Sequence, residues 1–161
     1  MKKNTTLYLA RAAMIAALYV VLTYLSALFG LSSGVIQLRF SEALTILPIF
    51  FPEAVLGLTV GCLLSNILVG SVLWDVVFGT VATLIGALGA RMLRKLPHKL
   101  KWVATIPTIL SNAIIVPFIL IYAYMLEGAY FYFLFTVFVG EFISAGIFGS
   151  LLYYLIVRKK I

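Results

Sequence analysis

Seven side chains stand inside or beside long apolar runs of this chain, where residues of their types are uncommon. One arginine, three carboxylic acids, two amides and a tryptophan form the set: Arg39, Glu42, Asn66, Trp74, Asp75, Asn112 and Glu141. An ionisable group at membrane depth costs a few kcal/mol on insertion scales and marks a functional site by default. Guanidinium and amide N–H donors beside carboxylate acceptors suit the recognition of a small, planar, polar molecule. We therefore predict that these residues bind such a ligand.

Several of these residues also have a structural interpretation. Arg39 and Glu42 are three residues apart, so they would share a helix face and could simply neutralise each other. Glu141 could neutralise Arg39 or hydrogen-bond between helices, and Asn112 could do the latter. Asp75 stands where a helix is expected to begin, so its charge could simply favour the helix dipole. Trp74 could belong to an aromatic belt at the membrane interface. The sequence leaves these alternatives open.

The charges of this group indicate what kind of ligand it prefers. Outside the basic clusters, the carboxylates Glu42, Asp75, Glu127 and Glu141 outnumber the cation Arg39 by four to one. Opposite charges attract and like charges repel, most strongly where water is scarce. A cavity there should prefer neutral, N–H-rich or cationic molecules over anions.

Motifs for chemistry by the chain itself are not found in the sequence. There is no glycine-rich phosphate loop ending in Lys-Ser or Lys-Thr, so ATP hydrolysis by this chain is not expected. The single histidine, His98, lies in a basic segment, and the single cysteine, Cys62, lies in an apolar run. We expect no enzyme activity, no metal and no cofactor. The net charge of +7 comes mostly from clusters at the edges of apolar runs, which does not suggest nucleic-acid binding.

The amino-acid composition indicates whether water or lipid surrounds the folded chain. Of the 161 residues, 64% are hydrophobic and 11% charged, and the mean hydropathy is +1.17. A soluble domain of this size would have to expose large apolar patches. The chain is therefore expected to be a single all-α integral membrane domain over residues 1–161.

Six apolar runs are long enough to predict membrane helices. They cover residues 7–29, 40–51, 54–69, 72–92, 102–126 and 129–157. The first run exceeds a signal-peptide core, so we expect it to be a retained span. Pro52 biases Phe51 away from helical geometry, which predicts a turn between the second and third runs. The second helix is then about 20 Å long, shorter than the hydrocarbon core.

Basic residues give the predicted orientation. With a turn at Pro52 and six spans, eleven of the twelve Lys and Arg residues fall on one side of the membrane. Without that turn, the basic segment 91–101 would lie opposite the N-terminus, against the positive-inside rule. We expect six transmembrane helices with both termini in the cytoplasm.

Small residues in the first predicted span suggest a packing surface. Ala12 and Ala16, and likewise Ala13 and Ala17, are four residues apart, which aligns each pair on one helix face. The stripe could dock a partner protein, or it could be an internal contact between helices.

The central part of the chain resembles a known family. The resemblance rests on Arg39 to Thr45, Leu47-Pro48, Pro52 to Leu58, Gly61-Cys62, Ser65-Asn66, Trp74 to Thr80 and Ala82-Thr83. These blocks are similar to the QueT family of queuosine-precursor substrate-binding subunits (S components) of energy-coupling factor (ECF) transporters. The similarity extends over essentially the whole chain.

The resemblance implies a multi-pass subunit of a prokaryotic cell membrane with the bundle fold of ECF S components. Such a subunit captures a 7-deazaguanine from outside and docks through its first helix, here Ala12, Ala13, Ala16 and Ala17, on a transmembrane coupling protein driven by two cytoplasmic ATPases. A carboxylate such as Glu141 or Glu42 could accept the adjacent N–H donors of the ring, and an amide could donate to its carbonyl oxygen. The alternatives are a stand-alone homo-oligomeric facilitator or channel and a membrane scaffold that transports nothing.

Overall fold

The computed structural model describes residues 5–32 and 36–158, and this part of the chain is helical with no β-strand. A helix occurs in each of the six predicted apolar runs. The main elements are α1 (Thr5–Leu28), η1 (Phe40–Ile49), α2 (Glu53–Leu68), α3 (Leu73–Met92), α4 (Ile106–Tyr122), α5 (Tyr130–Glu141) and α6 (Gly149–Arg158). Three short elements complete the order, η2 (Leu93–Lys95), η3 (His98–Thr105) and η4 (Phe142–Phe148).

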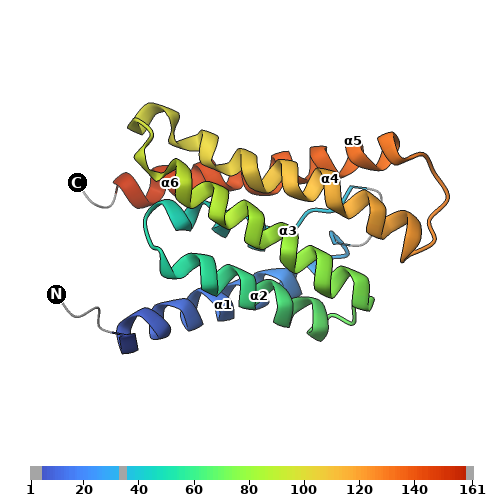
Figure 1. The fold of residues 1–161 in the computed structure, drawn as a ribbon, viewed down its shortest axis with the longest axis horizontal. Helices are drawn as coiled ribbons and strands as arrows, with labels where there is room; N and C mark the ends of the chain where they lie inside the picture. The colour runs from blue at the N-terminus through green and yellow to red at the C-terminus, as the bar shows by residue number, and fades with distance from the viewer. Residues whose placement is uncertain (1–4, 33–35, 159–161) are drawn as a thin grey trace.

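The long helices run side by side along the longest axis of the molecule, and both ends of the chain lie at the same end of the bundle (Figure 1). Neighbours in sequence pack together, α1 with α2, α2 with α3, α3 with α4 and α4 with α5. The helix η1 contacts α1, α2, α3, α6 and η4. The bundle is therefore built around η1.

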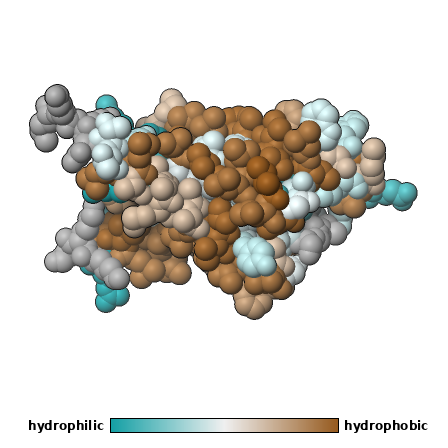
Figure 2. Space-filling view, turned by 90° about the horizontal axis from the view of Figure 1, so that it is seen from below, coloured by the Kyte–Doolittle hydropathy of each residue, from teal (hydrophilic) through white to brown (hydrophobic). Residues whose placement is uncertain are grey.

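Within residues 5–32 and 36–158, four helical segments are long and apolar enough to cross a membrane. They are Thr5–Leu28, Leu73–Lys95, His98–Tyr122 and Tyr130–Arg158, while Phe40–Ile49 and Glu53–Leu68 are shorter. Figure 2 shows a broad hydrophobic area across the middle of one face, with hydrophilic side chains toward the ends. Large exposed apolar side chains occur on every long helix. Such a surface is suited to lipid rather than water.

The helix η1 is a 3-10 helix with an almost completely buried surface. Eight of its ten residues are buried, among them Ser41, Glu42 and Thr45. Ten residues of 3-10 helix extend about 20 Å, which agrees with the short second helix expected from the sequence. Because η1 lies in the centre of the bundle, its polar side chains are held at the core.

The turn predicted at Pro52 is present. The backbone N–H of Phe51 donates to the carbonyl oxygen of Leu47 at 3.0 Å. Helix α2 begins at Glu53, directly after Pro52. Glu53 pairs with Arg11 of α1 at 3.1 Å. The chain thus reverses between η1 and α2 as the proline and the acidic first turn indicate.

The last apolar run is a continuous helical segment with an irregular middle. The α-helical stretches α5 and α6 are joined by η4, a π-helix that begins directly after Glu141. A π segment rotates the side chains that follow it relative to a regular helix and is frequent at functional sites. The sequence predicted one helix here, and the structure adds the π-helical stretch beside Glu141.

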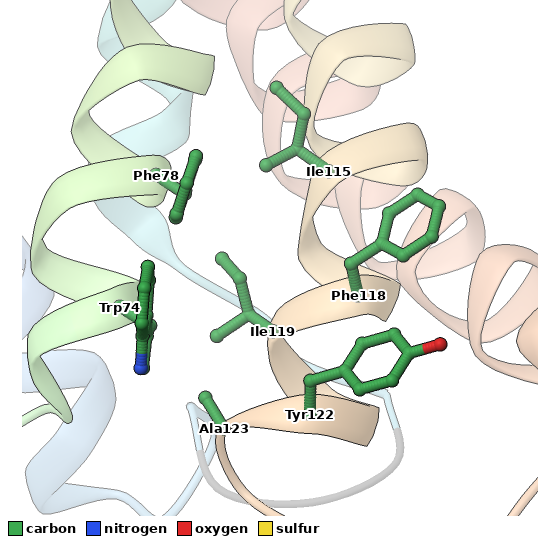
Figure 3. A pocket seen from close by; sticks show the side chains of 7 residues that line it. All are labelled: Trp74, Phe78, Ile115, Phe118, Ile119, Tyr122 and Ala123. Carbon is green, nitrogen blue, oxygen red and sulfur yellow. The ribbon is translucent and has the colours of Figure 1, made fainter.

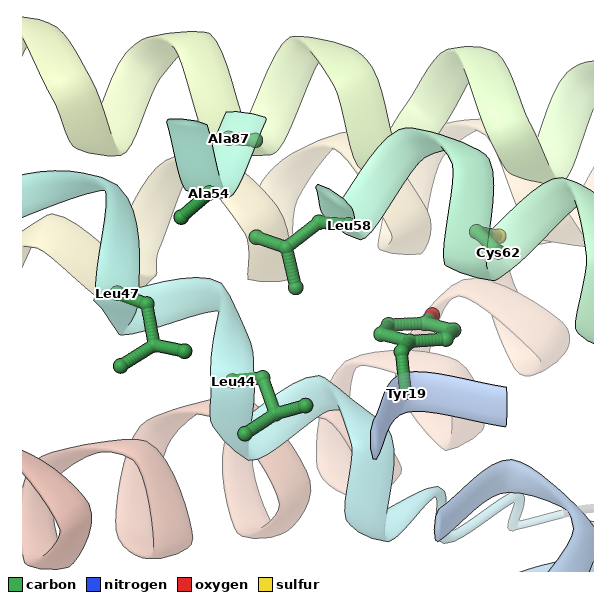
Figure 4. Close-up of a cluster of buried hydrophobic side chains, with 7 residues drawn as sticks. All are labelled: Tyr19, Leu44, Leu47, Ala54, Leu58, Cys62 and Ala87. Atoms are coloured by element: carbon green, nitrogen blue, oxygen red, sulfur yellow. The ribbon is translucent and has the colours of Figure 1, made fainter. Parts of the chain in front are cut away.

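Helices α1 and α2 approach closely because small residues face each other. A Cβ on Gly57 would lie 2.7 Å from the carbonyl oxygen of Ala12, and one on Gly61 would lie 3.1 Å from the Cα of Ala16. Next to this contact, Tyr19 and Leu58 belong to a buried cluster that also contains Leu44, Leu47, Ala54, Cys62 and Ala87 (Figure 4). The contact between α1 and α2 therefore has no room for larger side chains.

A larger residue at Gly61 should destabilise the protein. We expect Gly61→Val to lower the thermal unfolding midpoint of the detergent-purified protein, because overpacking at a close backbone contact costs about 1–3 kcal/mol. Ala10→Val, at an exposed position of α1, is the matched control and should leave the midpoint nearly unchanged. Equal midpoints for the two variants would contradict the close packing of α1 on α2.

Candidate functional site

A polar cavity opens at the end of the bundle opposite the chain termini. Its volume is about 580 Å³, and its lining comes from α1, the segment before η1, α2, the α2–α3 connection, α3, the end of α4 and the segment after α4. Its polar lining residues are Thr23, Ser32, Gln37, Arg39, Asn66, Ser71, Asp75 and Tyr124. The α2–α3 connection and the segment after α4, which both contribute to the cavity, lie at the right-hand end of Figure 1. Three of the residues predicted to bind a ligand, Arg39, Asn66 and Asp75, are thereby brought together.

Asp75 is the acidic group of this cavity. The Tyr124 hydroxyl donates to its Oδ2 at 3.1 Å, and the Arg39 guanidinium lies 3.9 Å from the same oxygen. Burial and the nearby Asp75 carboxylate raise the pKa of Tyr124, so its hydroxyl remains a hydrogen-bond donor. The Asp75 side chain is only 6% exposed. Asp75 is therefore a buried carboxylate that accepts a hydrogen bond from Tyr124 and has a guanidinium nearby, beyond hydrogen-bonding distance.

Asn66 lies next to Asp75 on the neighbouring helix. Its amide nitrogen donates to the backbone carbonyl of Asp75 at 3.3 Å and contacts the Cys62 sulfur at 3.7 Å. A Cβ on Gly79 would lie 3.1 Å from Asp75 Oδ1 and 3.2 Å from Asn66 Nδ2. The missing side chain of Gly79 thus leaves space beside both polar groups.

A second polar group lies in the interior and is absent from the cavity lining. Tyr19 donates to Glu42 Oε1 at 2.5 Å, while Glu42 Oε2 and Glu141 Oε2 are buried without a hydrogen-bond partner. Glu141 is close enough to interact with the Asn112 side chain and with the charge of Glu42. We call Glu42 and Glu141 the interior acidic pair.

Contacts between η1 and the last helical segment hold the interior acidic pair in place. The backbone N–H of Arg39 donates to the Ser144 hydroxyl at 3.1 Å. A Cβ on Gly140 would collide with the carbonyl oxygen of Gln37. On the other side, Thr23 donates to the Ser41 hydroxyl at 2.7 Å. Arg39 thus belongs both to the cavity lining and to the contacts around the pair.

Trp74 lies at a different surface. It is 60% exposed and stacks on Phe78 with a centroid distance of 5.7 Å. Both residues line an apolar groove of about 480 Å³ between α3 and α4, together with Ile115, Phe118, Ile119, Tyr122 and Ala123 (Figure 3). The structure thus separates Trp74 from the other predicted ligand-binding residues. Its position suits contact with lipid acyl chains.

The alanine stripe of α1 is divided between two environments. Ala12 and Ala16 are 4% and 6% exposed and face α2. Ala13 and Ala17 are exposed. The first pair forms the contact with α2, so only the second pair is free for a partner.

Several polar residues of the site were not anticipated from the sequence. Tyr19 lies in the middle of the apolar first span, and that position was the available signal. Tyr124 lies near the end of the fifth apolar run, where tyrosines are common at the membrane interface, and it donates to Asp75. Thr23 and Ser71 are small hydroxyl residues, which are common inside and between membrane helices and give no signal by themselves.

Comparison with known proteins gives the family of this chain. The family described as "QueT transporter" matches residues 9–158. A curated relative, "Queuosine precursor transporter QueT" of Lactococcus lactis subsp. cremoris (strain MG1363), is 41% identical over 86 residues, which are 53% of this chain and 50% of the relative. No solved structure matches the chain. The match to nearly the entire helical bundle shows that this chain is a member of the QueT transporter family.

Proposed function

We propose that this protein binds a queuosine precursor of the 7-deazaguanine class in the polar cavity and carries it across the membrane. The name of the Lactococcus relative supports the class of ligand. The observation that carries the proposal is the buried Asp75 carboxylate in a cavity of about 580 Å³. Small-molecule sites typically have about 300–1,000 Å³ and a few well-placed polar groups.

The chemistry of the cavity suits such a ring. A 7-deazaguanine has adjacent N–H donors on its pyrimidine edge, which a carboxylate accepts in pairs. Asp75 provides that acceptor, and Asn66 provides N–H donors near it for the carbonyl oxygen of the ring. Arg39 contributes the positive charge that partly balances the acidic groups. We infer that Glu42, Asn112 and Glu141 act from beneath this cavity.

The proposed orientation places the cavity outside the cell. Both chain ends, the α3–α4 connection and the C-terminus of α6 lie at one end of the bundle (Figure 1). Among the described basic residues, all except Arg39 belong to the first two turns of α1 or to these segments: Arg11, Arg91, Arg94, Lys95, Lys99, Lys101 and Arg158. Lys2, Lys3, Lys159 and Lys160 lie outside the described residues. By the positive-inside rule this end is cytoplasmic, which gives six crossings of a prokaryotic cell membrane.

Transport in this proposal draws its energy from partner proteins. The resemblance to ECF substrate-binding subunits implies a transmembrane coupling protein and two cytoplasmic ATPases. The exposed Ala13 and Ala17 near the basic end of α1 are the proposed docking surface. Small residues allow close approach of a second helix in lipid.

Reconstitution tests this function. The protein alone in proteoliposomes should bind labelled 7-deazaguanine without accumulating it, and accumulation should require the coupling protein, the ATPases and ATP. Passive equilibration of the label by the protein alone would instead show a facilitator. Absence of binding to the whole panel of 7-deazaguanines, purines, pteridines and vitamins would contradict a substrate-binding subunit.

A further inference from the structure

Arg39 makes only a loose contact with Asp75. Its guanidinium lies 3.9 Å from Asp75 Oδ2, beyond hydrogen-bonding distance, while Tyr124 donates to that oxygen at 3.1 Å. A well-formed arginine–carboxylate pair has two parallel N–H···O bonds of about 2.7–2.9 Å. A better donor pair could therefore replace the guanidinium on Asp75.

In the interior acidic pair, in contrast, one oxygen of each carboxyl group lacks a donor. Glu42 and Glu141 are 1% and 8% exposed, and each has a buried oxygen, Oε2, without a hydrogen-bond partner. A buried carboxylate oxygen without a donor is costly. A donor group that reached these two oxygens in another state of the protein would satisfy them.

Arg39 is the cation placed to reach both acceptors. Its neighbours with ionisable side chains are Tyr19 of α1, Glu42 of η1, Cys62 of α2 and Asp75 of α3, and Glu141 of α5 also interacts with its charge. Tyr19 and Cys62 are neutral as a phenol and a thiol, and Asn112 of α4 carries no charge. Three carboxylates thus share one guanidinium.

The backbone of Arg39 is held in place near both Asp75 and the interior acidic pair. Its N–H is bound to Ser144, which is three residues after Glu141, and Arg39 itself is three residues before Glu42. The backbone N–H of Glu42 donates to the carbonyl oxygen of Arg39 at 3.1 Å, which places the two residues one turn apart at the start of η1. With its backbone N–H bound in this way, Arg39 can move its guanidinium by rotation of its side chain alone.

We propose that Arg39 occupies, in the empty protein, the place on Asp75 that the ligand takes, and that binding transfers its guanidinium to Glu42 and Glu141. The ligand class is a planar ring with a guanidine-like edge, meaning a ring N–H and an amino N–H side by side. Such an edge matches the fork of an arginine and fits a carboxylate in the same way. This inference rests on the proposed function.

The exchange conserves charge and improves the hydrogen bonding. A neutral ring replaces a cation on Asp75, and the cation neutralises part of the interior acidic pair. Arginine keeps its proton throughout. Ligand affinity then depends on Glu42 and Glu141 although neither touches the ligand.

A double-mutant cycle in nanodiscs tests the transfer, with 7-deazaguanine as the calorimetric probe. Glu141→Gln should weaken binding at least tenfold in the wild-type background. In the Arg39→Gln background the same change should alter binding less than twofold, because no guanidinium is left to transfer. Arg39→Gln alone should still bind, since Asp75 remains. Glu42→Gln repeats the cycle if Glu141→Gln is unstable, and Glu127→Gln, in an exposed segment, is the matched control.

The other outcomes exclude the transfer. A similar loss of ligand affinity from Glu141→Gln in the wild-type and Arg39→Gln backgrounds would mean that Glu141 contacts the ligand directly or has a structural role. No loss of affinity in either background would mean that the interior acidic pair takes no part in binding. Complete loss of binding in Arg39→Gln would make Arg39 a ligand contact.

A second ligand, 7-deazahypoxanthine, lacks the amino group and should bind at least tenfold more weakly; equal binding would overturn the role of Asp75. Failure of the wild-type protein to bind either ring would overturn the proposed function itself.

Discussion

Asp75→Asn is expected to weaken the binding of 7-deazaguanine by about 100-fold, the equivalent of about 2.7 kcal/mol. The aspartate is buried, so its hydrogen bonds to the ligand are formed away from water and are charge-assisted. Asparagine replaces one acceptor oxygen by an NH₂ donor, which would face the N–H donors of the ring. Removing the charge also leaves Arg39 without its partner. Calorimetric titration of the purified protein measures the effect.

Two comparisons separate this effect from a loss of folding. Glu127→Gln removes an exposed carboxylate and should change the dissociation constant less than twofold. Tyr124→Phe removes the hydroxyl that holds Asp75 Oδ2 and should weaken binding several-fold with the fold intact. If Asp75→Asn is well folded and binds within threefold of wild type, Asp75 is a structural residue at the start of α3.

Ala13→Trp should abolish uptake while leaving ligand binding unchanged. Ala13 is exposed on α1, two residues after Arg11, and far along the chain from the cavity residues of that helix. An indole there would prevent close approach of another helix. Uptake into proteoliposomes that contain the coupling protein and the ATPases is the measurement, and calorimetric titration gives binding separately.

The controls for Ala13→Trp come from two other positions. Leu88→Trp places an indole on α3, where Leu88 is 48% exposed, and should preserve uptake. Ala16→Trp should instead reduce stability, since Ala16 packs against Gly61. Normal uptake in Ala13→Trp would remove the proposed docking surface from α1.

Much of the fold follows from local features of the sequence. Apolar runs placed the helices, and Pro52 followed by Glu53 placed the reversal after η1. The short second helix followed from the distance between Arg39 and that turn. These features act within a few residues along the chain, so they can be read without knowledge of the packing.

The sequence did not show which of the polar residues lie together in the folded protein. Predicted as one set, they are divided between the cavity with Asp75 and the interior with Glu42 and Glu141, and Trp74 lies in an apolar groove. The π-helical segment after Glu141 also has no recognisable sequence signal. The rotation of each helix about its axis decides these placements.

The sequence by itself indicated that lipid surrounds the chain and where the helices and the turn at Pro52 lie. It also gave the kinds of polar groups available to a ligand. Only the tertiary structure decided which of those groups meet, that Ala12 and Ala16 are covered while Ala13 and Ala17 are free, and that Arg39 lies between two sets of carboxylates. The physical reason is that lipid surrounds apolar helices without distinguishing their faces. Close packing at small residues such as Gly57 and Gly61, and hydrogen bonds between residues far apart in the chain, fix the rotation of each helix.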